Sequence, residues 1–89
     1  MQNYPTLPMF TSLIPNDEFA LLEKSYQIFL HEEPDRILFK CVHDDRVEFL
    51  TQYNSSCYKT TMSPASLDKL VEAKTKGATI EEICALIIN

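Results

Sequence analysis

The chain has 89 residues and a formal net charge of −5. Its length predicts a single domain over residues 1–89, and a hydrophobic share of 45% is enough to form a core. The acidic balance argues against nonspecific nucleic-acid binding and against an anionic membrane surface as partner, because both require a basic patch. With one glycine, the chain has no glycine-rich phosphate loop.

The cysteines and the first residues indicate the compartment. The chain contains Cys41, Cys57 and Cys84, an odd number without a CxxC pair, whereas small secreted domains have an even, dense set. The first ten residues lack the basic and apolar segments of a signal peptide. No apolar run approaches the roughly 18 residues of a membrane span. We therefore expect a cytoplasmic protein with free thiols.

Residues 1–15 form an N-terminal arm that favours extended backbone, because Pro5, Pro8 and Pro15 oppose a helix. The arm is too apolar for a free tail. One interpretation lays it across the core, with residues 9–14 as an edge strand. The other makes it a docking arm that inserts into a partner or into a second copy of the chain.

A helix is predicted over residues 16–30, with Asn16 as its N-cap. Phe19, Leu22 and Tyr26 follow the spacing of one helical face, and Pro34 ends the segment. Leu21 and Ile28 fall on the opposite face of such a helix. They are either covered by a second layer or exposed as an apolar contact site.

Three strands are expected next, over residues 36–43, 46–53 and 57–62, as an antiparallel meander. A two-residue loop at Asp44 and Asp45 would mix the two faces of the first hairpin. A three-residue loop over residues 44–46, with one residue in the left-handed region, pairs Cys41 with Phe49 and makes one face almost wholly apolar. We therefore predict the three-residue loop.

Two helices complete the chain. Ser63 and Pro64 are typical of a helix start, and Gly77 of a helix end. Thr79 and Glu82 have the spacing of a capping box for a last helix that ends at residue 88. The predicted fold is thus α+β, with the order α-β-β-β-α-α behind the arm.

The sequence contains little that indicates catalysis, a metal or a cofactor. It has no GxSxG, HExxH or Walker motif. Cys41 and His43 lie two residues apart, but a thiolate–imidazole pair needs closer atoms than neighbours on one strand face provide. With Cys57 they supply three zinc ligands, where a structural site needs four. We predict no catalytic, cofactor-binding or metal residues.

The function predicted from these features is protein–protein interaction without catalysis, as an adaptor, inhibitor or regulatory protein. Small acidic chains of this kind are also typical of inhibitors encoded by viruses and mobile elements. The predicted contact surface combines apolar residues of the arm and the first helix with two charged residues at its rim. Its members are Tyr4, Leu7, Phe10, Glu18, Leu21, Lys24 and Ile28.

Two alternatives remain open. A nucleic-acid-linked transcriptional regulator requires Lys69, Lys74 and Lys76 to form a basic patch, although the acidic residues of the last helix oppose direct nucleic-acid binding. An acidic nucleic-acid mimic requires clustered carboxylates instead. The candidates for that cluster are Asp44, Asp45, Glu48, Glu32, Glu33 and Asp35.

Overall fold

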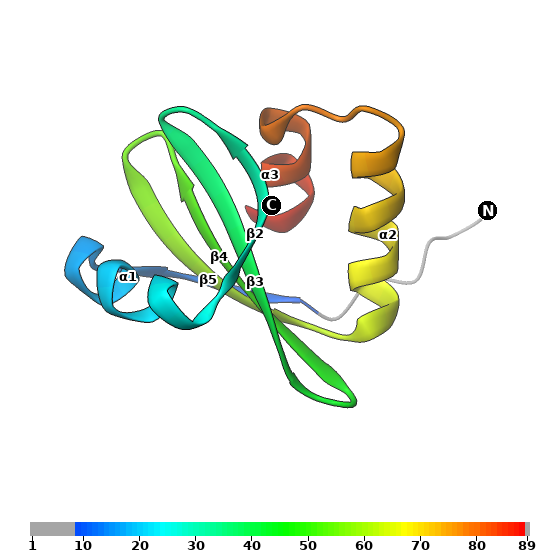
Figure 1. The fold of residues 1–89 in the computed structure, drawn as a ribbon, viewed down its shortest axis with the longest axis horizontal. Helices are drawn as coiled ribbons and strands as arrows, with labels where there is room; N and C mark the ends of the chain where they lie inside the picture. Colours follow the sequence, from blue (N-terminus) through cyan, green and yellow to red (C-terminus); the bar gives the residue numbers. More distant parts are fainter. Residues whose placement is uncertain (1–8, 89) are drawn as a thin grey trace.

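The computed structural model describes residues 9–88, which form an α+β fold as predicted (Figure 1). The N-terminal part contains β1 (Phe10–Ile14), α1 (Asn16–Leu22), a short 3-10 helix η1 (Glu23–Ser25) and β2 (Gln27–Glu32). The rest contains β3 (Asp35–His43), β4 (Arg46–Tyr53), β5 (Ser56–Met62), α2 (Pro64–Thr75) and α3 (Ile80–Ile88).

The strands form one five-stranded antiparallel sheet in the order β1-β5-β4-β3-β2. The predicted meander is present as β3-β4-β5 at its centre, but the sheet has five strands, not three. The predicted element order is wrong in this respect. β1 confirms the interpretation of residues 9–14 as an edge strand, and β2 forms the other edge.

The predicted helix over residues 16–30 is wrong in its second half. α1 ends at Leu22, and the chain passes through η1 into β2. The apolar stripe of the predicted helix is divided between the two sides of the sheet: Phe19 packs on one side and Phe29 on the other. Pro34 stands in the turn between β2 and β3, after a cis peptide bond, instead of ending a helix.

Pairing with β3 explains why these residues form a strand. A helix here would leave the backbone groups at the edge of β3 without partners. As a strand, the segment pairs Ile28 with Leu38 and Leu30 with Ile37. Phe29 is the extra residue of a bulge, and its ring makes an edge contact with Phe49 at a centroid distance of 5.1 Å.

The predicted hairpin register is wrong, although the predicted face is right. Asp44 and Asp45 form a two-residue turn, and a bulge at Val42 shifts the pairing so that Cys41 opposes Val47. The positive φ angles among the described non-glycine residues belong to Asn54 and Ser55, in the next turn. A two-residue turn alone would mix the two faces, but the bulge shifts the pairing beyond it by one further residue. The odd-numbered apolar side chains of β3 and β4 therefore still share one face.

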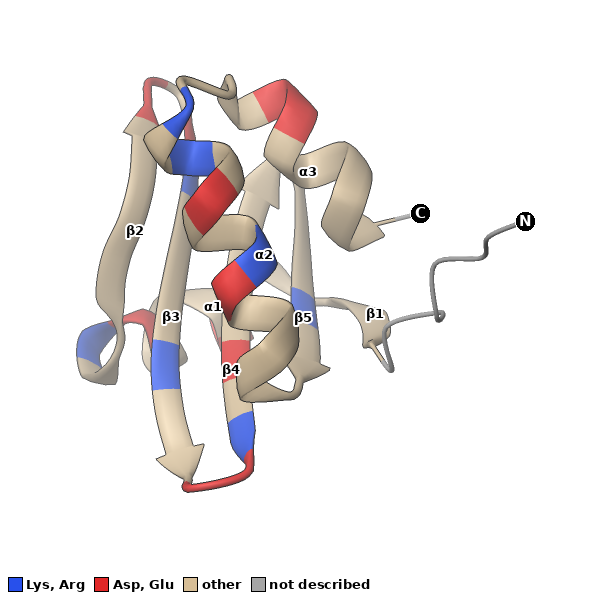
Figure 2. Ribbon diagram, turned by 90° about the vertical axis from the view of Figure 1, so that its right-hand side faces the viewer, with Lys and Arg blue, Asp and Glu red and all other residues tan. Residues whose placement is uncertain are grey.

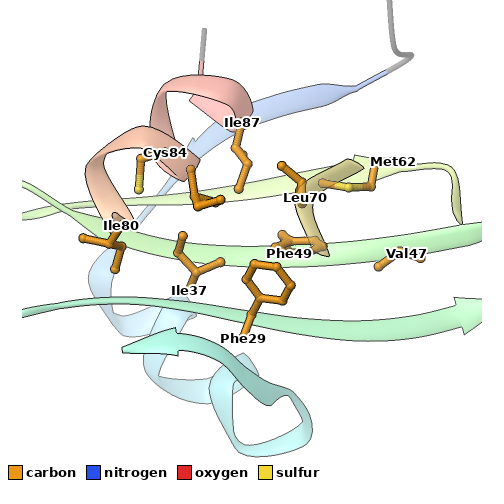
Figure 3. Close-up of a cluster of buried hydrophobic side chains, with 10 residues drawn as sticks. Phe29, Ile37, Val47, Phe49, Met62, Leu70, Ile80, Cys84 and Ile87 are labelled. Atoms are coloured by element: carbon orange, nitrogen blue, oxygen red, sulfur yellow. The ribbon is translucent and has the colours of Figure 1, made fainter. Parts of the chain in front are cut away.

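The larger core lies between this face and the helices α2 and α3 (Figure 3). We call it the α2/α3 core. Its buried members come from both helices and from four strands: Phe29, Ile37, Val47, Phe49, Met62, Leu70, Ile80, Ile83, Cys84 and Ile87.

The predicted boundaries of these helices are confirmed by their caps. Ser63 accepts a hydrogen bond from the backbone N–H of Ser66, and Gly77 ends α2 with a φ of +92°. In the capping box, the Thr79 N–H donates to Glu82 Oε1 at 2.8 Å. The Glu82 N–H in turn donates to Thr79 Oγ1 at 3.2 Å. These local bonds fix where α3 begins.

Candidate interaction surface

A second, smaller core lies on the other face of the sheet, beneath α1. We call it the α1 core, and its buried members are Phe19, Leu38, Leu50 and Cys57. α1 has seven residues and buries Phe19 fully, with Leu22 half-buried beside it. The sheet is therefore covered on both faces, but by one short helix on this side (Figure 1).

Arg36 of β3 connects the end of α1 to the sheet. Its guanidinium forms an ion pair with Glu23 at 2.7 Å, and its Nε donates a hydrogen bond to Gln52 at 3.1 Å. The same group lies 5.2 Å from the centre of the Phe19 ring. Less than a third of either side chain in the ion pair is exposed, so this pair is better shielded from solvent than an ordinary surface pair.

A second polar contact holds the segment between η1 and β2. The Tyr26 hydroxyl donates a hydrogen bond to Glu48 at 2.7 Å, and the Lys40 ammonium lies 5.7 Å from the centre of the Tyr26 ring. Burial raises the pKa of Tyr26 well above its usual range, and the hydrogen bond and negative charge of Glu48 raise it further. Tyr26 therefore keeps its proton and remains a donor at neutral pH.

Asn16 has a role other than the predicted N-cap. Pro15 occupies the N-cap position, where no side chain caps the helix, and Asn16 is the first residue of α1. Asn16 Oδ1 instead accepts a hydrogen bond from the Cys57 thiol at 3.2 Å. Burial raises the pKa of this thiol, which keeps it protonated and able to donate.

Leu21 and Ile28 are exposed. Leu21 lies on the outer side of α1, and 72% of its surface is accessible. Ile28 lies on the edge strand β2, opposite Leu38, and is 61% exposed. Because opposed residues of paired strands share a face, Ile28 lies on the α1 side of the sheet. Both side chains therefore face solvent on the same side, although they belong to different elements.

Phe10 is the most exposed large apolar side chain among the described residues, at 81%. Ile14 packs against the α1 core, so alternation along β1 places Phe10 on the same side of the sheet. However, β1 and β2 are opposite edges, which separates Phe10 from Ile28 by roughly 19 Å, four strand spacings of about 4.8 Å. The predicted surface is thus split between the two edges of the sheet.

The remaining predicted members add charge or lie elsewhere. Glu18 and Lys24 are exposed, and neither forms a salt bridge within residues 9–88. Tyr4 and Leu7 lie outside the described residues. The structure thus brings Leu21, Ile28, Glu18 and Lys24 to the α1 side, with Phe10 at the far edge.

Sequence reasoning missed the contacts that hold α1 in place. Arg36 and Glu23, like Tyr26 and Glu48, are far apart in the chain, and no local pattern marks either pair. Lys40 and Glu48 are directly opposed in the register of β3 and β4. Of the contacts in this region, the opposition of Lys40 and Glu48 is the one that the alternation of strand residues can indicate.

The charged residues required by the two alternative functions do not gather in one place (Figure 2). On α2, acidic and basic residues alternate, Lys76 pairs with Glu72 at 3.4 Å, and Lys74 lies over the Phe29 ring. The turns that carry Glu33 and Asp44 lie at opposite ends of β3, whose nine residues span eight steps of about 3.3 Å, or about 26 Å. The basic patch is therefore interrupted, and the two acidic groups are separate.

The described residues contain no group of three or more His, Cys, Asp and Glu side chains placed to hold a metal ion. Cys41 is exposed, and Cys57 and Cys84 are buried on opposite faces of the sheet. None of the described helices is long and apolar enough to cross a membrane.

Comparisons with protein-family models, with curated proteins and with solved structures find no match for this chain.

Proposed function

We propose that this chain is a cytoplasmic protein that binds another protein without catalysis, as an adaptor, inhibitor or regulatory protein. The observation that carries the proposal is the exposure of Leu21 and Ile28 on the same side of the sheet. Large exposed apolar side chains on one side of a small protein are typical of contact sites. The exposed charges of Glu18 and Lys24 provide a polar rim, as in ordinary interfaces.

The way α1 is held supports this assignment. α1 buries Phe19 and packs Leu22 beside it, and the segment that follows the helix is held on the sheet by the Arg36–Glu23 and Tyr26–Glu48 contacts. Contact residues that are held in place before binding lose less entropy on association. Leu21 lies on the docked helix, and Ile28 lies on the edge strand β2 on the same side of the sheet.

The test is an affinity capture from a lysate of the source cells, with bound proteins measured by quantitative mass spectrometry. The test variant is Leu21→Glu/Ile28→Glu, and the matched control is Val71→Glu/Leu86→Glu, which alters two exposed apolar residues on α2 and α3. Circular dichroism must first show that both variants are folded. We expect a partner that the wild type and the control retain and the test variant loses.

Two results would contradict the proposal. Capture of the same partner by the folded test variant would show that the surface lies elsewhere. If the wild type enriches no protein over the bare resin, the binding function itself is without support.

A further inference from the structure

The two edges of the sheet differ in how they are protected. β2 has a bulge at Phe29, carries His31 and Glu32, and ends at the Glu33–Pro34 turn. Bulges, charges and prolines are the features by which natural sheets prevent pairing with other chains. β1 has the sequence FTSLI, with no charge, no proline and a regular register against β5. Within residues 9–88, the β1 edge therefore lacks these protective features.

β1 also exposes a large apolar side chain on each face of the sheet. Phe10 and Leu13 are 81% and 69% exposed, and they lie on opposite faces because strand side chains alternate. Thr11 lies on the same face as Leu13, and its hydroxyl donates a hydrogen bond to the Ile87 carbonyl of α3 at 2.8 Å. As the terminal strand of the described sheet, β1 has backbone N–H and C=O groups that no strand pairs on its outer side.

We propose that β1 pairs antiparallel with β1 of a second copy of this chain, about a twofold axis at Ser12, to form a continuous ten-stranded sheet. In this register, Ser12 opposes Ser12, Thr11 opposes Leu13 and Phe10 opposes Ile14 of the second copy. Phe10 and Ile14 both lie on the α1 side, so each exposed Phe10 ring gains an apolar neighbour. The strand is complementary to itself in backbone and in side chains.

Charge makes β1 the better of the two edges for pairing between copies of this chain. Each chain carries a net charge of −5, so two copies repel each other least where the contacting segments are uncharged. The five residues of β1 fulfil this condition, whereas pairing through β2 would bring Glu32 into the interface. A basic partner would find no carboxylate on β1 to bind. The observations therefore favour self-pairing over a charged protein partner at this edge.

This inference goes beyond the proposed function and does not rest on it. The dimer uses the edge of the sheet at β1, whereas Leu21 lies on α1 and Ile28 on β2, the opposite edge. A monomeric wild type would overturn the dimer without affecting the proposed contact surface, and a failed capture experiment would leave the dimer in place.

The test is sedimentation equilibrium of the full chain from micromolar to near-millimolar concentration. We expect a reversible monomer–dimer equilibrium for the wild type and at least tenfold weaker dimerisation for Ser12→Lys, which places two lysines side by side at the axis. The matched control is Gln27→Lys, the same charge change at an exposed position of the other edge strand. A wild type that is monomeric throughout, or equal effects of the two lysines, would overturn the proposal.

A cross-linking experiment tests the register and does not depend on the folding of Ser12→Lys. In a Cys41→Ser background, which removes the exposed native thiol, Ser12→Cys is compared with Gln27→Cys under mild oxidation. Opposed residues at a twofold axis lie close enough to form a disulfide between two copies. We expect a covalent dimer from Ser12→Cys and monomer from Gln27→Cys; equal yields would contradict the proposed axis.

Discussion

The α2/α3 core buries ten residues beneath two helices, whereas the α1 core buries four beneath one helix of seven residues. The larger core is almost wholly apolar. Around the smaller core, polar contacts supplement the burial: Arg36 binds Glu23, Tyr26 binds Glu48, and Cys57 binds Asn16. A short helix with little buried area is the kind of element that opens locally while the rest stays folded. The comparison therefore indicates that stability resides mainly on one face of the sheet, whereas the exposed residues of the proposed contact surface lie on the other.

The largest effect that follows from this comparison concerns two phenylalanines. Phe49 is fully buried in the α2/α3 core, and we expect Phe49→Ala to lower the free energy of unfolding by about 3–5 kcal/mol. The same change at Phe19 should cost less. α1 can detach from the sheet, so the loss of stability cannot exceed the free energy with which α1 docks. Urea denaturation of the two variants measures both values. A loss at Phe19 equal to or larger than that at Phe49 would contradict the unequal roles of the two faces.

The next effect concerns Arg36, whose replacement should loosen α1 alone. We expect Arg36→Ala to cost about 1–2 kcal/mol, because the ion pair with Glu23 and the contact with the Phe19 ring are lost together. The matched control is Lys76→Ala, which breaks an exposed pair with Glu72 and should cost no more than about 0.5 kcal/mol.

Thiol alkylation shows where Arg36→Ala acts. Cys57 is buried in the α1 core, and Cys84 of α3 is buried in the α2/α3 core; burial raises the pKa of both thiols, that of Cys84 to about 12. Both therefore react through opened states at mildly alkaline pH. We expect Cys57 to react faster than Cys84 and Arg36→Ala to accelerate Cys57 about tenfold, since about 1.4 kcal/mol is a factor of ten. Equal acceleration of both thiols would indicate global opening instead.

How well the sequence predicted each region follows the same division. The boundaries of α2 and α3 could be predicted because Ser63, Gly77 and the Thr79–Glu82 box act within a few residues. β2 could not, because its bulge at Phe29 removes the alternation of a regular strand and leaves a spacing that also suits a helix. Its conformation is decided by pairing with β3, a contact that no local pattern contains.

The exposed residues show a related limit. Leu21 was expected on the helix face opposite Phe19, either covered or exposed, and it is exposed on the outer side of α1. Ile28 was expected on the same helix face, but it is exposed because it lies on an edge strand opposite Leu38. Its exposure follows from the position of β2 at the border of the sheet. The hydrophobic pattern singled out both residues, but the exposure of Ile28 is determined by tertiary structure.

The smallest effect concerns Tyr26 and pH. Tyr26→Phe removes the hydrogen bond to Glu48, and we expect it to lower the stability at neutral pH by about 1 kcal/mol. The control is Tyr58→Phe, because Tyr58 is also half-buried and its hydroxyl forms no side-chain hydrogen bond within the described residues. Urea titrations at neutral pH should show a clearly smaller loss for the control.

The sign of the pH dependence follows from the raised pKa of Tyr26. The folded chain keeps the phenol proton at pH values where the unfolded chain, with a tyrosine pKa of about 10, loses it. The contribution of Tyr26 is therefore fully present below pH 10 and declines as the pH rises above it. Tyr53, Cys57 and Cys84 have raised pKa values as well, so the wild type should lose stability in alkali for several reasons. The difference between wild type and Tyr26→Phe isolates one of them: it should shrink above pH 10, and a difference that grows there would contradict the assigned role of the Tyr26–Glu48 contact.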